Sequence, residues 1–146
     1  MYSFLLHTHY YLMIALLALL LFTAGRFFMN FKQGNPFGKF ENTQSLLVVL
    51  LAHIQFIIGI SLLFTSPLAE NFSDMSNVMS NSVLRLKLIE HPTTMLIAII
   101  LVTVGRAIAK RKTESRQKFK FIAIFYAIAL VLIAIRIPWQ YISSHG

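Results

Sequence analysis

The sequence predicts an all-α membrane protein, a single domain of residues 1–146 folded as a four-helix transmembrane bundle in up-down-up-down order. Three observations predict this fold. Hydrophobic residues make up 57% of the 146 residues and charged residues only 12%, with a mean hydropathy of +0.70. Four apolar runs each approach the roughly 20 residues that cross a bilayer as a helix. None of these runs has the polar face of a helix on the surface of a soluble protein.

The four runs are separated by segments whose composition indicates turns. The runs cover residues 4–25, 45–65, 88–109 and 119–142. Gly34 and Pro36 mark turns in the first connection, and Ser66-Pro67 ends the second run. Residues 67–85 are rich in Ser, Asn and Met and are expected to form a loop, with a helical turn from Ser82 leading into the third run. The third connection, residues 110–118, is a short charged turn.

The distribution of Lys and Arg predicts the orientation of the bundle. These residues concentrate in and beside the first and third connections, at Arg26, Lys32, Lys39, Arg106, Lys110, Arg111, Lys112, Arg116, Lys118 and Lys120. The middle connection has only Arg85 and Lys87, accompanied by three acidic residues. Because cytoplasmic loops carry the excess of cationic residues, the basic loops are expected in the cytoplasm and both termini in the periplasm of a bacterial inner membrane.

The net charge of +8 indicates which partners to expect. Because the cationic residues lie between apolar runs, we expect membrane lipids with anionic headgroups as partners, and no nucleic acid. The absence of Cys excludes disulfides, thiolate metal sites and iron–sulfur clusters. The spans contain too few carboxylates for a di-metal carboxylate site, and no nucleophile elbow or phosphate-binding loop is present. The sequence therefore leaves open whether the protein is an enzyme.

Ionisable side chains inside the predicted spans are the candidate functional residues, because placing them in a bilayer is costly. The rise per residue of a helix gives the distance along its axis from the cytoplasmic Lys or Arg that anchors it. This distance is roughly 25 Å for His9, roughly 22 Å for His91 and roughly 24 Å for Arg136. These three are therefore expected at one level near the outer side, and His53, at about 13 Å, near the bilayer centre. An aromatic belt is expected at the outer level, from Tyr10, Tyr11, Trp139 and Tyr141.

Small residues at helical spacing predict the packing faces of the last two helices. On the third helix the face comprises His91, Thr94, Ala98, Val102, Gly105 and Ala109, so that His91 is expected to point inward. On the fourth helix the expected face comprises Ala123, Ala127 and Ala134. Arg136 lies away from that second face.

The matching depth of His9 and His91 on different helices is what a bis-histidine haem b site requires. Arg136, Arg85 or Lys87 would then neutralise the haem propionates. His53 could instead serve a deeper haem or lie beside a quinone. In the alternative interpretation, the histidines contact headgroup water or form interhelical hydrogen bonds, and Arg136 extends its charge to the membrane surface.

Four motifs carry a resemblance to a known family. They are His7 with His9, Ala52-His53-Ile54-Gln55, Glu90-His91-Pro92 and Arg136-Ile137-Pro138-Trp139. With them the chain resembles small four-helix inner-membrane proteins of Bacteroidota, often labelled cytochrome b-like. The resemblance implies an inner-membrane location, haem, and functional roles for His9, His53 and His91 with Arg136 as a charge partner.

The leading functional interpretation is an integral membrane haem-b protein that transfers electrons, with a quinone as a further expected contact. The first alternative is a non-enzymatic accessory or assembly subunit of a larger membrane complex, without a cofactor. The second is a module that binds quinone or lipid without a metal.

Overall fold

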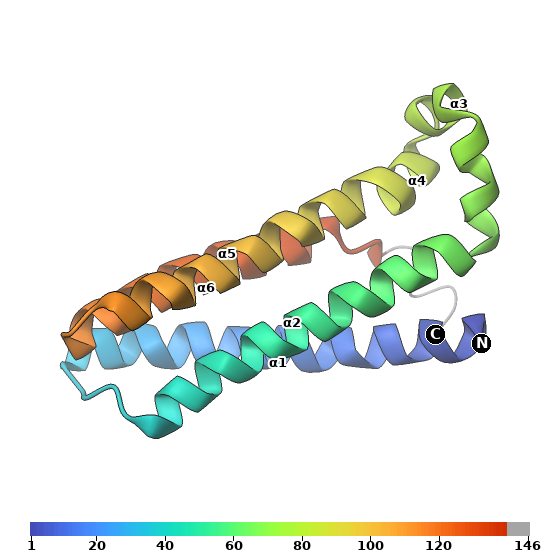
Figure 1. Cartoon of the computed structure of the whole chain (residues 1–146). Coiled ribbons are helices and arrows are strands. Elements are labelled where there is room, and N and C mark those ends of the chain that lie inside the picture. The colour runs from blue at the N-terminus through green and yellow to red at the C-terminus, as the bar shows by residue number, and fades with distance from the viewer. Residues whose placement is uncertain (140–146) are drawn as a thin grey trace.

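The computed structural model describes residues 1–139, and within them the regular secondary structure is entirely helical, without strands (Figure 1). The four long segments are α1 (Tyr2–Gln33), α2 (Lys39–Thr65), α5 (His91–Arg111) and α6 (Ser115–Arg136). Between α2 and α5 lie η1 (Pro67–Ser73), α3 (Met75–Ser80), α4 (Ser82–Arg85) and the π-helical turn η2 (Leu86–Glu90). Within the described range, four helical segments are long and apolar enough to cross a membrane, the third running from Ser82 to Arg111. The chain is therefore a multi-pass membrane protein.

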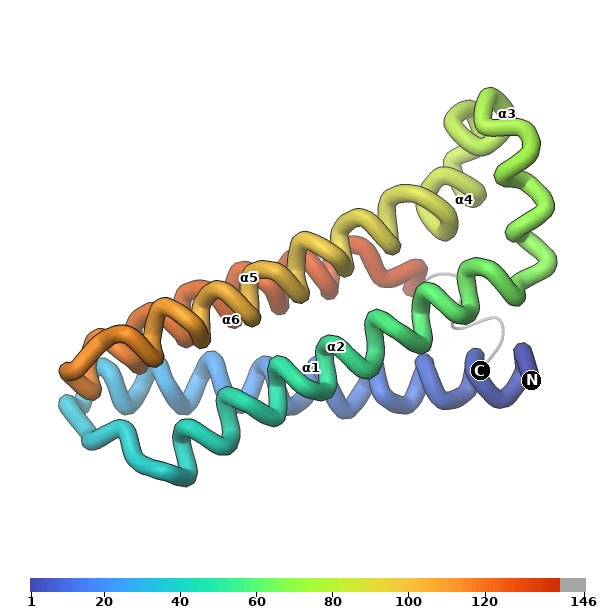
Figure 2. The backbone as a smooth tube through the Cα atoms, in the orientation of Figure 1, coloured from blue at the N-terminus to red at the C-terminus, as the bar shows by residue number. Residues whose placement is uncertain are grey.

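The four long helices alternate in direction, and each packs on two neighbours. α1 contacts α2 and α6, while α5 contacts α6 and α2. The four helices lie close together at the end that carries the connections 34–38 and 112–114, which we call the basic end (Figure 2). The paths of α5 and α6 diverge from that of α1 toward the opposite end, which we call the open end and which residues 66–90 span (Figure 2). The prediction of an all-α four-helix bundle is confirmed.

The helices extend beyond the apolar runs at the basic end. α1 continues to Gln33 and stops at Gly34, whose φ of 70° is the left-handed conformation that commonly ends helices. α2 already begins at Lys39, where the Glu41 carboxylate accepts a hydrogen bond from the Gly38 amide at 2.8 Å. The first connection is therefore shorter than the sequence suggested, because the helical backbone does not end where its side chains become polar.

The fourth helix differs from its predicted range at both ends. It begins at Ser115 and ends at Arg136. Pro138 restricts the preceding residue to extended conformations, and Ile137 has φ −74° and ψ 132°. The predicted end of this helix at Ile142, and Tyr141 of the predicted aromatic belt, lie outside the described residues.

The prediction of a loop over residues 67–85 is wrong, because most of this segment forms short helices. Each helix begins at a polar side chain that accepts hydrogen bonds from the amides of its first turn. Ser66 accepts from Leu68 at 3.1 Å, Asp74 from Asn77 at 3.2 Å, and Asn81 from Val83 and Leu84 at 3.0 and 3.2 Å. The polar residues that suggested a loop are therefore N-caps of short helices.

The closest helix contact joins α5 and α6. A Cβ atom added at Gly105 would overlap the Cβ of Phe125 and lie 2.8 Å from its Cγ. The buried residues of α5 include Ala98, Val102, Gly105 and Ala109, as the small-residue pattern predicted. On α6 the pattern was right for Ala123, which is buried, and wrong for Ala127, which is exposed, and the large Tyr126 is buried beside Ala123.

We predict that Gly105→Ala destabilises the protein by roughly 1–3 kcal/mol, as overpacking of a close contact does. The added methyl group must displace the backbone-proximal atoms of Phe125, which a rotamer change cannot move away. The matched control is Gly25→Ala on α1, where an added Cβ has no neighbour within 4 Å. Thermal unfolding in detergent micelles compares the two variants, and equal melting temperatures would contradict this packing.

Candidate functional site

A cavity of about 530 Å³ lies between the diverging helices at the open end. All four long helices line it, and most of its lining side chains are apolar, among them Leu16, Ala52, Met95, Val102 and Ile133. Its size falls within the range of about 300–1,000 Å³ that is usual for cofactor and ligand sites. The divergence of α5 and α6 from α1 therefore leaves space for a ligand within the bundle.

His9 of α1 and His91 at the start of α5 meet in this cavity. Their ring centroids are 6.3 Å apart, and the ring planes are nearly perpendicular at 86°. Both side chains line the cavity, and both are partly buried. The structure thus brings together the two histidines that depth counting placed at one level.

The orientation of His91 is fixed by the end of α6. Its Nδ1 donates a hydrogen bond to the backbone carbonyl of Arg136 at 2.9 Å. That carbonyl belongs to the last residue of α6, where helix carbonyls lack partners within their own helix. Since a carbonyl can only accept, Nδ1 carries the proton in the neutral ring, and the lone pair is on Nε2. Nε2 is therefore the nitrogen of His91 that is available to act as a ligand.

The position of His9 depends on two residues of α2. A Cβ atom added at Gly59 would lie 3.1 Å from Cε1 of His9, so the glycine leaves space for the ring. One turn earlier, the Gln55 Nε2 donates to the backbone carbonyl of His9 at 2.7 Å. The His9 Nδ1 and the Gln55 Oε1 are buried and, among the described residues, have no hydrogen-bond partner. Buried polar atoms are usually satisfied, so these two are available to a ligand or to water.

The other residues that the sequence analysis proposed for the site are not all brought to the cavity that holds His9 and His91. The His53 ring is exposed, donates to the Val49 carbonyl of its own helix at 2.7 Å, and does not line the cavity. Arg136 contacts the site through its backbone carbonyl, and its side chain is not part of the cavity lining. Arg85 pairs with Glu90 at 3.4 Å, whereas Lys87 lines the cavity.

Gly59 is the residue of this site that the sequence analysis missed. Gln55 and Gly59 are four residues apart and therefore share one face of α2. A single glycine inside an apolar helix, one turn from a polar residue, is a signal for close approach by another group. The two positions identify the face of α2 that meets His9, whereas His53 points elsewhere.

Two histidines alone do not make a structural or catalytic site for a bare metal ion. Among residues 1–139, no three His, Asp or Glu side chains are placed to hold one ion together. Zinc sites use three or four protein ligands. A histidine pair suits a metal whose other ligands come from a cofactor, as the macrocycle of haem supplies.

Comparison of this chain with protein-family models, curated proteins and solved structures finds no match. The functional conclusions therefore rest on the histidine pair, its hydrogen bonds and the surrounding cavity.

We predict that His9 and His91 can be cross-linked when both are replaced by cysteine, since their side chains meet in the cavity. The natural chain has no cysteine, so the double variant His9→Cys, His91→Cys contains a single reactive pair. A short bis-maleimide should join the pair within one chain, as measured by intact mass and peptide mapping. The matched control is His53→Cys, His91→Cys, in which the second thiol lies on an exposed face of α2. Equal cross-linking of the two variants would contradict the described position of His53.

Proposed function

We propose that this protein is an integral membrane haem-b protein with His9 and His91 as the axial ligands of the iron. The observation that supports it is the separation of the two ring centroids, 6.3 Å. Because a metal–imidazole bond is about 2 Å long, two imidazoles on opposite sides of one metal ion have ring centres about 6 Å apart. The described pair has this separation before any ligand is considered.

The hydrogen bond of the His91 ring fits the same role. Metal-bound histidines usually donate their second ring N–H to a carbonyl or carboxylate, which fixes the tautomer and the ring orientation. His91 makes such a bond to the Arg136 carbonyl at 2.9 Å. His9 has space for its ring opposite Gly59. In both rings, Nε2 makes no hydrogen bond within the described chain, so each is available as a ligand.

The cavity around the pair fits a large apolar macrocycle with acidic edges. Its volume is about 530 Å³, and apolar side chains from four helices line it. Lys87 lies in the cavity lining, whereas the Arg136 side chain does not. Lys87 is therefore the cationic residue that we assign to the propionates.

With His9 and His91 both as ligands, a haem held here would have no open coordination position for a substrate and would be suited to electron transfer. The cofactor supplies the redox chemistry, while the chain binds it, orients it and excludes water. The apolar lining of the cavity and its position between membrane-crossing helices support a quinone as the redox partner. The unpartnered Gln55 Oε1 is the acceptor in this region that a quinol hydroxyl would meet.

We predict that the purified protein shows a Soret band and, after reduction, the sharp visible bands of a six-coordinate haem b. His9→Ala and His91→Ala should each abolish or strongly reduce this spectrum, whereas the controls His7→Ala and His53→Ala should retain it. The perpendicular ring planes further predict a highly anisotropic low-spin EPR signal from the oxidised protein.

A colourless protein from cells supplied with haem would overturn this proposal. It would favour the accessory or assembly subunit of a larger membrane complex, or the metal-free module that binds quinone or lipid. Loss of the spectrum only in His53→Ala would indicate that the cofactor binds on the outer face of α2. This result would contradict His9 and His91 as the ligands.

We also propose that the protein lies in a bacterial inner membrane with its basic loops in the cytoplasm, as the Lys and Arg distribution favours. An alkaline phosphatase reporter fused after Gly146 should then be active, because this enzyme matures only in the periplasm. The matched fusion after Thr113, in the connection between α5 and α6, should be inactive. The reverse pattern of reporter activity would show that the orientation in the membrane is opposite to the one proposed. It would not contradict the proposed histidine site.

A further inference from the structure

The net charge of the chain is confined to one end of the bundle. Of the 13 Lys and Arg residues, ten lie at the basic end, where the only carboxylates are Glu41 and Glu114. The open end has three cationic residues, Arg85, Lys87 and Arg136, and three acidic residues, Glu70, Asp74 and Glu90. The open end is therefore neutral, and the whole excess of +8 lies at the basic end.

Aromatic rings, more than carboxylates, accompany the cations of the basic end. Arg26 forms an ion pair with Glu41 at 2.9 Å. By contrast, Cζ of Arg116 lies 4.6 Å from the ring centroid of Phe31, and Nζ of Lys118 lies 5.6 Å from the ring centroid of Phe37. Such contacts stabilise a cation without neutralising it. The positive charge of this end therefore remains available to an external anion.

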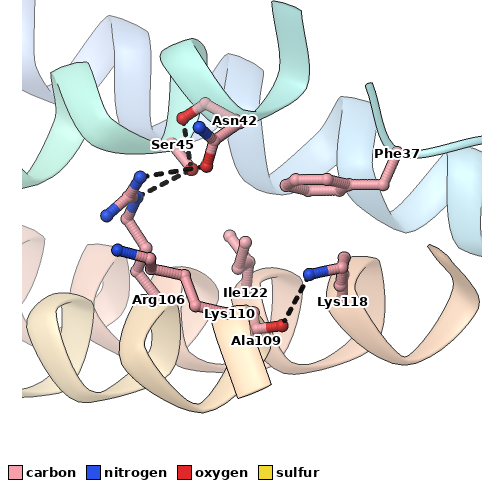
Figure 3. A pocket seen from close by; sticks show the side chains of 8 residues that line it. All are labelled: Phe37, Asn42, Ser45, Arg106, Ala109, Lys110, Lys118 and Ile122. Carbon is pink, nitrogen blue, oxygen red and sulfur yellow. Dashed lines mark hydrogen bonds between the residues drawn. The ribbon is translucent and has the colours of Figure 1, made fainter. Parts of the chain in front are cut away.

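Three of these cations gather around one crevice, shown in Figure 3. The crevice lies where the start of α2, the end of α5 and the start of α6 meet, and we call it the basic crevice. Its lining comprises Phe37, Asn42, Ser45, Arg106, Ala109, Lys110, Lys118 and Ile122. Three of these residues are cationic and none is acidic, so the lining as a whole favours an anion.

The side chain of Arg106 is held in position within the crevice. Its Nε donates to the Ser45 hydroxyl at 3.1 Å, and its Nη2 donates to the Asn42 side-chain carbonyl at 2.9 Å (Figure 3). These bonds leave Nη1 without a hydrogen-bond partner within the described chain. A guanidinium fixed in this way can bind an oxyanion with little further loss of side-chain entropy.

The two lysines of the crevice complement Arg106. Lys118 Nζ donates to the Ala109 carbonyl at 3.2 Å, which places its charge at the end of α5 (Figure 3). Lys110 is exposed and forms no ion pair with any described carboxylate. The enclosed space of the crevice is about 10 Å³, which holds about one water molecule. An anion must therefore bind across the mouth of the crevice, at the membrane surface.

We propose that the basic crevice binds the phosphate group of an anionic phospholipid, with Arg106, Lys110 and Lys118 as its ligands. Basic pockets between transmembrane helices are suited to anionic headgroups. The apolar side chains of Phe37 and Ile122 line the same crevice, next to the three cations. This combination favours a phosphate that carries acyl chains over a free phosphate ion. The site is separate from the cavity of His9 and His91, and its occupation does not require haem.

Native mass spectrometry of the detergent-purified protein tests this site, with titrations of phosphatidylglycerol, phosphatidylcholine and inorganic phosphate. We expect phosphatidylglycerol to bind in preference to phosphatidylcholine. The double variant Lys110→Gln, Lys118→Gln should weaken phosphatidylglycerol binding about tenfold. The matched control Lys32→Gln, Lys39→Gln removes the same charge from the same end but leaves the crevice lining unchanged, and should weaken binding less than about threefold.

Thermal stability in detergent, measured without added lipid, identifies any folding defect of the double variant. Arg106→Lys provides a second variant, which keeps the charge but loses the planar guanidinium, and should also weaken phosphatidylglycerol binding. Equal losses in the crevice and control pairs would overturn the proposal in favour of diffuse attraction to the whole basic end. Equal binding of phosphatidylcholine, or displacement of the lipid by millimolar phosphate, would overturn it as well.

Discussion

Ser45 fixes the separation of three helices at the basic end, and the remaining architecture depends on this contact. Its carbonyl accepts a hydrogen bond from the buried Tyr126 hydroxyl at 2.8 Å, and its own hydroxyl accepts from Arg106 at 3.1 Å. The hydroxyl also donates to the Asn42 carbonyl at 2.8 Å. Because Ser45 and Tyr126 are fully buried in the protein, separating α2 from α5 and α6 here would leave buried polar atoms unsatisfied. The helices are held together at this end and can diverge only toward the other.

The divergence creates the cavity, and two further interhelical hydrogen bonds tie α5 to α6 and α2 to α1 beside it. His91 bonds to the Arg136 carbonyl, and Gln55 bonds to the His9 carbonyl. The interpretation of the histidines as simple interhelical hydrogen-bonding groups accounts for Nδ1 of His91. It does not account for the ring of His9, whose Nδ1 is buried without a partner in the described chain and whose place opposite Gly59 requires the absence of a side chain there. A cofactor bound through Nε2 would account for the space opposite Gly59 but would leave Nδ1 of His9 without a partner in the described chain.

Depth along a helix could be predicted from the sequence, whereas the direction of a side chain around the helix could be predicted only in part. Counting residues from the basic anchors placed His9 and His91 at one level, because the rise of a helix is constant. The same counting could not show that His53 faces outward, because the rise along a helix does not give the direction of a side chain around it. The small-residue rule identified the packing face of α5 but only part of that of α6, where Tyr126 is buried because the Ser45 carbonyl accepts its hydroxyl. That partner lies on another helix, and no local pattern reveals it.

The position of the cavity restricts how a haem held there could exchange electrons. His9 lies seven residues from the start of α1, which is roughly 10 Å along the helix, whereas the end of α1 at Gln33 lies roughly 36 Å beyond it. A single cofactor at this depth is close to one membrane surface and far from the other, so it cannot by itself carry electrons across the bilayer. Its partner must approach the open end or diffuse within the membrane plane. The open end has no net charge to attract a charged soluble protein, whereas a quinone needs no such attraction and enters from the lipid phase. The charge distribution and the depth of the histidines therefore both favour a quinone over a charged soluble partner.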